Sequence, residues 1–221
     1  MLRIDEYIEK LTFILKNTFE ERLLYIGLQG SYLRHEETEN SDIDIMAVID
    51  KITVEDLKAY QKALVLTGNY DKSCGFICGK ADLAHWNPLE ICHLLNATKD
   101  YYGELKKLVP RYTLEDERNY VKLSLNNLYH EICHRYIHAD RECNVSRLPI
   151  TCKSVFFIMQ HLVYLSSGNF VQTKRELPEY LKGEDRAVLE LSLSLRENTD
   201  FDFDRAFSLL FNRCRSVLLR I

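Results

Sequence analysis

The sequence predicts an α+β protein in which a small mixed sheet with its helices is followed by an all-α bundle. Three observations support this prediction. Apolar runs rich in β-branched residues occur only before Pro110. After Pro110, apolar residues recur at helical spacing. With only 4 prolines and 8 glycines in 221 residues, regular structure should continue through most of the chain. We therefore expect an α/β domain at residues 1–109 and a bundle of about four or five helices at residues 110–221.

Apolar runs bounded by turn residues mark the expected strands. Leu23–Leu28 ends just before Gly30, which is the pattern of a buried strand that enters a turn. Asp42–Ile49 alternates at first and then becomes wholly apolar, so it should form the second strand. Ser73–Cys78 is the expected third strand, and a short helix with a final strand near Tyr101–Leu105 should complete the sheet.

Capping patterns mark the starts of two helices. Thr53-Val-Glu-Asp56 should begin a helix that continues to about Leu66, and Thr113-Leu-Glu-Asp116 should begin a long helix. Apolar periodicity predicts the other helices at residues 2–22, 151–166, 184–196 and 203–219.

Composition narrows the class of protein. Hydrophobic residues make up 46% and charged residues 28%, as in an ordinary soluble protein, and the net charge of −4 gives no positive field that would attract nucleic acid. The 7 cysteines lack framework spacing, which favours reduced thiols, and we interpret Cys74 and Cys78 as small core residues. No apolar run approaches the roughly 20 residues that span a bilayer, and the acidic start MLRIDEYIEKLTF does not resemble a signal peptide. We expect a cytoplasmic protein with no membrane partner.

Two aspartates at the start of the second predicted strand form the first half of a candidate site. Asp42 and Asp44 stand two residues apart, so their side chains should project from the same face of the strand. Carboxylates held side by side repel each other, and a divalent cation relieves that repulsion. Hard oxygen ligands suit magnesium, which in turn neutralises phosphate oxygens.

Gly30-Ser31 forms the second half of the candidate site. A strand that turns at a glycine into a short helix leaves backbone N–H groups unpaired, and such a helix start attracts anions such as phosphate. The glycine permits close approach of the backbone, and the Ser31 hydroxyl adds a donor. The ten residues between Ser31 and Asp42 are enough for a helical turn and a return loop.

The pattern Gly-Ser-x10-Asp-x-Asp resembles the signature of the DNA polymerase beta-type nucleotidyltransferase superfamily, including minimal and kanamycin-type aminoglycoside nucleotidyltransferases. The resemblance is specific over residues 23–50 and looser to about residue 109. It implies that Gly30 and Ser31 bind a triphosphate and that Asp42 and Asp44 are catalytic ligands of Mg²⁺. It also implies a nucleotidyltransferase that moves a nucleotidyl group from ATP, or another nucleoside triphosphate, to an acceptor hydroxyl. Arg34 could hold a phosphate or be a solvated surface charge.

The sequence departs from this family at the third carboxylate, which usually lies on a neighbouring strand. The expected strand Ser73–Cys78 contains no Asp or Glu. We take Asp82 as the first candidate for this catalytic role. The alternatives are Asp71, Glu90 and Glu104. If no residue fills the role, the protein is instead a nucleotide-binding regulator or antitoxin-like protein with a degraded active site.

A competing motif lies on the long helix. His130-Glu131-Ile-Cys-His134 matches H-E-x-x-H, in which two histidines on one helix face hold zinc and the glutamate activates water. His138 extends the row, but the longer metzincin pattern is absent. We rank a zinc hydrolase below a histidine face that contacts the acceptor and below histidines that simply face solvent.

The sequence does not identify the acceptor. A small hydroxylated molecule such as an aminoglycoside, a protein side chain and an RNA end all remain open. The acidic net charge favours a cationic small molecule over protein or RNA. An oligomer is possible.

Overall fold

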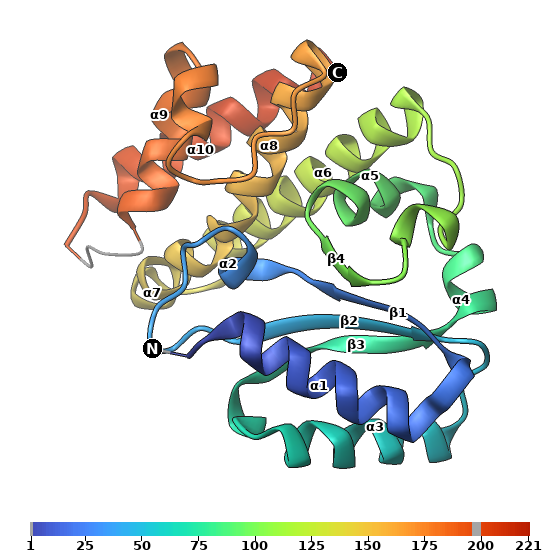
Figure 1. Ribbon diagram of the computed structural model, residues 1–221. Helices are drawn as coiled ribbons and strands as arrows, with labels where there is room; N and C mark the ends of the chain where they lie inside the picture. Colours follow the sequence, from blue (N-terminus) through green and yellow to red (C-terminus); the bar gives the residue numbers. More distant parts are fainter. Residues whose placement is uncertain (1, 196–199) are drawn as a thin grey trace. The chain divides into compact units, whose positions relative to one another are not determined.

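The computed structural model describes residues 2–195 and 200–221 (Figure 1). The chain forms two compact units, Met1–Tyr112 and Thr113–Ile221. The first unit contains a four-stranded mixed sheet with helices, and the second is helical. This combination confirms the α+β class predicted from the sequence.

The sheet of the first unit has the order β3-β2-β1-β4. Its strands are β1 (Leu23–Leu28), β2 (Ile43–Ile49), β3 (Ser73–Gly79) and β4 (Lys99–Tyr102). β1 is antiparallel to both β2 and β4, whereas β2 and β3 are parallel. The first three strands lie within a residue of their predicted positions. The fourth begins and ends earlier than expected.

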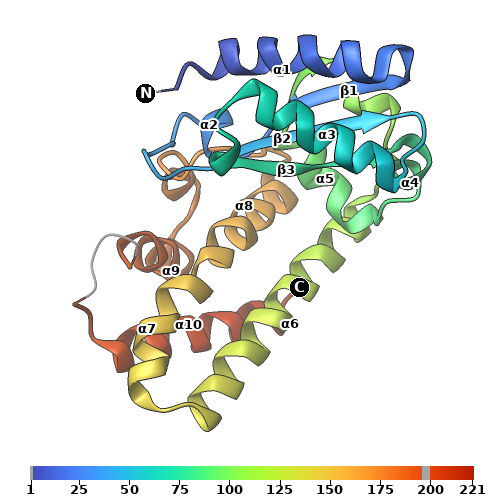
Figure 2. The same cartoon turned by 90° about the horizontal axis from the view of Figure 1, so that it is seen from below.

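Helices cover both faces of this sheet. α1 (Ile4–Phe19) and α3 (Val54–Thr67) lie side by side on one face, as Figure 2 shows. They pack with the β2 residues Ile45, Ala47 and Ile49. The alternate residues Met46 and Val48 pack on the other face with residues of α4 (Lys80–Ala84) and α5 (Pro88–Asn96). Because successive strand residues point to opposite faces, β2 is apolar throughout its length after Asp44.

The second unit is a bundle whose helices surround a separate apolar core. Its helices are α6 (Leu114–His138), α7 (Arg141–Thr151), α8 (Lys153–Ser167), α9 (Gly183–Ser194) and α10 (Phe203–Leu218). α6 contacts α8 and α10, and these two helices both contact α9 as well. The predicted end of α9 at residue 196 lies outside the described residues.

One helix of this bundle was not predicted. The sequence indicated a single helix at residues 151–166, but α7 precedes it and ends at Thr151. α7 carries Pro149 inside the helix and few apolar residues, so it lacks the periodic stripe that identifies a helix in sequence.

The segment Arg141–Ser167 bears on the expectation that no stretch of the chain spans a membrane. By length and composition it passes as a candidate span, although the sequence suggested none. One face of α8 is nevertheless buried inside the bundle, where Val155, Phe156, Ile158 and Met159 belong to the core. A buried core helix of a soluble protein satisfies the same criteria, so this segment is weak evidence for a membrane.

A charged cluster joins β1 to the start of α3. Asp56 completes the predicted capping box, because its Oδ2 accepts hydrogen bonds from the N–H and hydroxyl of Thr53 at 2.9 and 3.0 Å. Arg22 donates to the two oxygens of Asp56 at 2.9 and 3.0 Å and to Asp50 at 2.9 Å. These bonds, those from Arg22 foremost, lower the pKa of Asp56 to about 2.

We expect the substitution Asp56→Asn to flatten the pH dependence of stability in acid. The folded pKa of about 2 is below the unfolded value of about 3.9. The ionised carboxylate therefore stabilises the fold above about pH 4, and this contribution is lost as the pH falls toward about 2. Urea unfolding across this window should show a shallower decline for Asp56→Asn than for the wild type. Glu55→Gln, which removes an exposed charge from the same helical turn, should retain the wild-type slope. Equal slopes for wild type and Asp56→Asn would contradict the assignment.

Candidate functional site

The turn after β1 lies directly against the start of β2. Gln29 donates its backbone N–H to the carbonyl of Asp44 at 2.9 Å, and the short helix α2 (Gly30–Leu33) follows at once. Gly30 has a φ of 72°, and a Cβ at this position would lie 1.8 Å from Oδ2 of Asp44. Both facts exclude other residues here. The Gly30 backbone therefore approaches a carboxylate more closely than any residue with a side chain would permit.

Asp42 and Asp44 lie at the same end of the sheet as this turn. Asp42 immediately precedes β2 and is exposed, whereas Asp44 is the second residue of the strand and is half-buried. Ile43 and Ile45 are each 1% exposed and pack into the core on the α1 and α3 side. Because strand residues alternate, the two aspartates face the other side together.

The pKa of Asp44 is raised above its ordinary value. The main cause is burial, and the negative charge of Asp42 raises the pKa further. A hydrogen bond from the Cys74 thiol and the positive charge of Arg34 act in the opposite direction. Burial and the neighbouring carboxylate both disfavour the ionised form of Asp44, and a cation at this position would stabilise that form.

Arg34 lies close enough to Asp44 for its charge to act on that carboxylate, and it is not a solvated surface charge. Its side chain is only 14% exposed, and its Nε donates to Glu36 Oε2 at 3.1 Å. The loop between α2 and β2 is also tied to the start of β3, because Lys72 Nζ donates to the Glu39 carbonyl at 2.6 Å. The structure therefore brings Gly30, Arg34 and Asp44 together, with the Ser31 backbone beside them in α2.

Cys74 lies beside Asp44 on β3, the strand on which the family resemblance implies a third carboxylate. β3 is parallel to β2, and Cys74 is the register partner of Asp44. The Cys74 thiol donates a hydrogen bond to the Asp44 carboxylate. Cys74 is exposed, so its interpretation as a core residue is wrong, whereas Cys78 is buried as expected. Among the residues that the structure describes, no third His, Cys, Asp or Glu forms a ligand cluster with Asp42 and Asp44. Sequence reasoning missed Cys74 because only the strand register reveals the contact.

The structure does not bring Asp82 to the two aspartates. Asp82 follows the end of β3, where its Oδ2 accepts the Gly79 N–H at 3.0 Å. Cys74 and Gly79 are five strand positions apart, which separates them by roughly 16 Å at the usual rise. Asp82 therefore caps α4 at the opposite end of the sheet.

The other candidate carboxylates either contact other side chains or lie on the opposite face of the sheet. Glu90 accepts a hydrogen bond from the Trp86 indole at 2.6 Å, and Glu104 pairs with Lys107. Asp71 precedes β3 and lines a groove beside α3, on the face of the sheet opposite Asp44.

The histidine row lies on α6 in the second unit. His130, His134 and His138 are exposed, and the successive ring centroids are 5.8 and 4.7 Å apart. Glu131, the water-activating residue of the H-E-x-x-H motif, instead accepts hydrogen bonds from Arg135 at 2.5 Å and from the Thr151 hydroxyl at 3.0 Å. This carboxylate is committed to contacts within the helical unit, which does not favour the zinc hydrolase.

Comparison with known proteins finds similarity of structure. No protein-family model and no curated protein sequence matches the chain. The solved structure of spectinomycin adenyltransferase AAD(9) from Enterococcus faecialis, with ATP and spectinomycin, is similar over 95% of this chain and 98% of its own. The sequence identity is 15% and the TM-score is 0.60. A toxin-antitoxin structure with AMP-PNP is similar over 62% of this chain and 94% of its own, at 20% identity, but its TM-score of 0.35 is too low to support a conclusion. The chain thus shares the fold of the nucleotidyltransferase AAD(9).

Proposed function

We propose that the protein is a nucleotidyltransferase that binds a nucleoside triphosphate, ATP by preference, with Mg²⁺ and transfers the nucleotidyl group to an acceptor hydroxyl. The observation that carries the proposal is the close approach of the Gly30 backbone to the Asp44 carboxylate. This approach joins an anion-binding turn to a pair of metal-binding carboxylates. The fold shared with AAD(9) supports the same conclusion.

The two aspartates fit a magnesium ion. Both offer hard oxygen donors on one side of the strand, and the raised pKa of Asp44 marks a place where negative charge lacks compensation. Asp42 and Asp44 would hold the ion. When bound, the ion would neutralise triphosphate oxygens and the charge that develops at the α-phosphorus.

The start of α2 fits a phosphate. No side chain caps this helix, so its first N–H groups are left for an anion. Gly30 gives the anion access to the backbone, the Ser31 hydroxyl adds a donor, and the Arg34 guanidinium adds a positive charge held by Glu36. These three residues would bind the triphosphate.

The acceptor is proposed from charge alone. The net charge of −4 favours a hydroxylated cationic small molecule over RNA.

The described cysteines are all free, which agrees with a reducing compartment, and we place the protein in the cytoplasm.

A second candidate is a nucleotide-binding regulator that does not catalyse transfer. The observation in its favour is that Cys74 lies beside Asp44 where a third carboxylate would complete the site. Two aspartates can hold a metal–triphosphate complex, but the acceptor proton then has no carboxylate base near it.

We expect ATP affinity to depend on magnesium through the two aspartates. Calorimetry should show Mg²⁺ raising the affinity of the wild type for ATP by roughly 10- to 100-fold. In Asp42→Asn/Asp44→Asn this gain should largely vanish, because the metal loses its protein ligands. An undiminished magnesium effect in the double variant would refute the metal site.

We expect Gly30→Ala to weaken ATP binding by roughly tenfold or more, since the new Cβ overlaps Asp44 Oδ2. Gly68→Ala is the matched control. Gly68 also has a positive φ, of 96°, but a Cβ there meets no atom within 4 Å. It carries a similar backbone strain without touching the site, so ATP affinity should be unchanged. Equal losses in both variants would show that strain, and not the site geometry, controls binding.

Transfer itself separates the two candidate functions. With α-labelled ATP and a panel of hydroxylated cations, the enzyme should release pyrophosphate and label an acceptor. Asp82→Asn should leave this rate within about twofold of wild type, because Asp82 caps α4 far from the site, whereas loss of a general base costs about 10²–10⁴-fold. Tight binding of Mg²⁺–ATP without pyrophosphate release would favour the regulator.

A further inference from the structure

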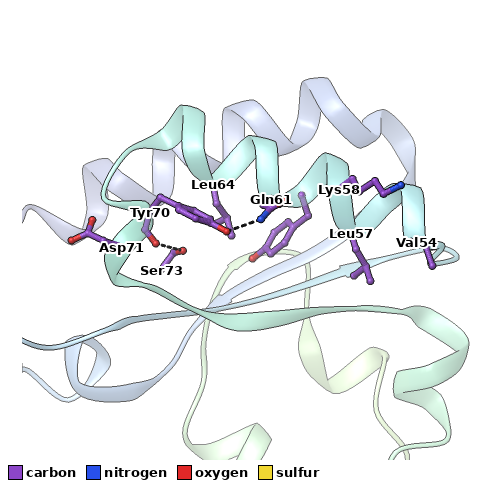
Figure 3. Close-up of a pocket in the computed structure, with 9 residues that line it drawn as sticks. Val54, Leu57, Lys58, Gln61, Leu64, Tyr70, Asp71 and Ser73 are labelled. Atoms are coloured by element: carbon purple, nitrogen blue, oxygen red, sulfur yellow. Dashed lines mark hydrogen bonds between the residues drawn. The ribbon is translucent and has the colours of Figure 1, made fainter.

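An open groove runs along α3 on the side of the sheet opposite the aspartates. It has a volume of about 680 Å³. Residues of α3 form one wall, and the turn Tyr70–Lys72 with the first residue of β3 closes one end, as Figure 3 shows. The lining includes Val54, Leu57, Lys58 and Leu64 of α3 and Tyr70 and Asp71 of the turn.

Beside its buried face, α3 has a second apolar stripe that is exposed at Val54 and Leu57 and half-buried at Leu64. Asp56, Tyr60, Ala63 and Thr67 are the buried face of the helix. Beside them Val54, Leu57 and Leu64 recur at helical spacing, yet Val54 is 62% and Leu57 47% exposed. Tyr70 adds a further exposed ring at the end of the groove. Exposed apolar side chains gathered along one groove are a candidate contact surface.

The neighbouring edge strand cannot fill this space. Ser73 and Gly75 pair in register with Ile43 and Ile45, so they lie on the α3 side of the sheet. Neither is large. Gly75 also has a φ of 99°, which interrupts the extended conformation that strand addition requires. The edge therefore disfavours an added β-strand, and the helix wall is the surface left for a partner.

The charges at the two ends of the groove are complementary to each other. Lys58 lies near the end at Val54, and Asp71 lies at the opposite end, as Figure 3 shows. Both are exposed, and neither forms an ion pair with a described residue. In two copies related by a two-fold axis that passes midway between these residues, each Lys58 would lie opposite the other copy's Asp71. A two-fold interface needs this self-complementarity.

We propose that this groove is the contact surface between two copies of the chain, with their α3 helices packed antiparallel. Val54 and Leu57 of each copy cover the Tyr70 end of the other, and two Lys58–Asp71 pairs fix the register. The apolar stripe supplies burial, and the charges supply specificity.

Sedimentation equilibrium tests the proposal with complementary charge reversals. The wild type should form dimers at a loading concentration of about 100 µM. Lys58→Asp and Asp71→Lys should each weaken dimerisation by about 100-fold, because each creates two like-charge contacts. An equimolar mixture of the two variants should restore the dimer, since every contact in the mixed pair is again attractive. Leu57→Asp should abolish it.

Lys62→Asp is the matched control. It makes the same charge change on the same helix, but Lys62 does not line the groove, so the dimer should persist. Circular dichroism would show that each variant is folded. A monomeric wild type, single reversals that still dimerise, or a mixture that remains monomeric would each overturn the proposal. A peptide or another protein in the groove would leave the wild type monomeric.

Discussion

The contact between the Gly30 backbone and the Asp44 carboxylate is the constraint on which the site depends. β1 and β2 are antiparallel neighbours, and the Gln29 N–H bond to the Asp44 carbonyl extends their pairing to the turn. The turn proposed to bind the phosphate and the strand proposed to bind the metal are therefore held together by the sheet itself. Only glycine satisfies both the positive φ and the absence of a Cβ at this contact.

The same geometry explains why the aspartates lie only at the start of β2. From Ile45 onward every side chain of the strand is buried in one of two apolar clusters. A carboxylate deeper in the strand would have no compensating partner or solvent. Asp44 is the carboxylate that lies furthest along β2, and burial already raises its pKa.

The features encoded by neighbouring residues could be predicted from the sequence. The capping boxes at Thr53 and Thr113 and the same-face aspartates each depend on a span of a few residues, and the structure has the elements where these patterns indicated. The contact of Cys74 with Asp44 depends on the parallel register of two strands separated by a helix, which no local pattern reports. Asp82 illustrates the same limit. It is close to β3 in sequence, but it follows the end of the strand that is far from Asp44.

The hydrogen bond from Lys72 to the Glu39 carbonyl has a consequence for regulation. One side of the turn Tyr70–Lys72 lines the groove along α3, and the other holds the loop that carries Arg34. The proposed nucleotide site and the proposed contact surface therefore share one short segment, and if binding at one site affects the other, thermodynamic linkage makes that effect reciprocal. Whatever factor the nucleotide applies to the dissociation constant of the dimer, pairing of the copies applies to the affinity for the nucleotide. A cell could then set the responsiveness of the protein to its nucleotide through the concentration of the protein alone.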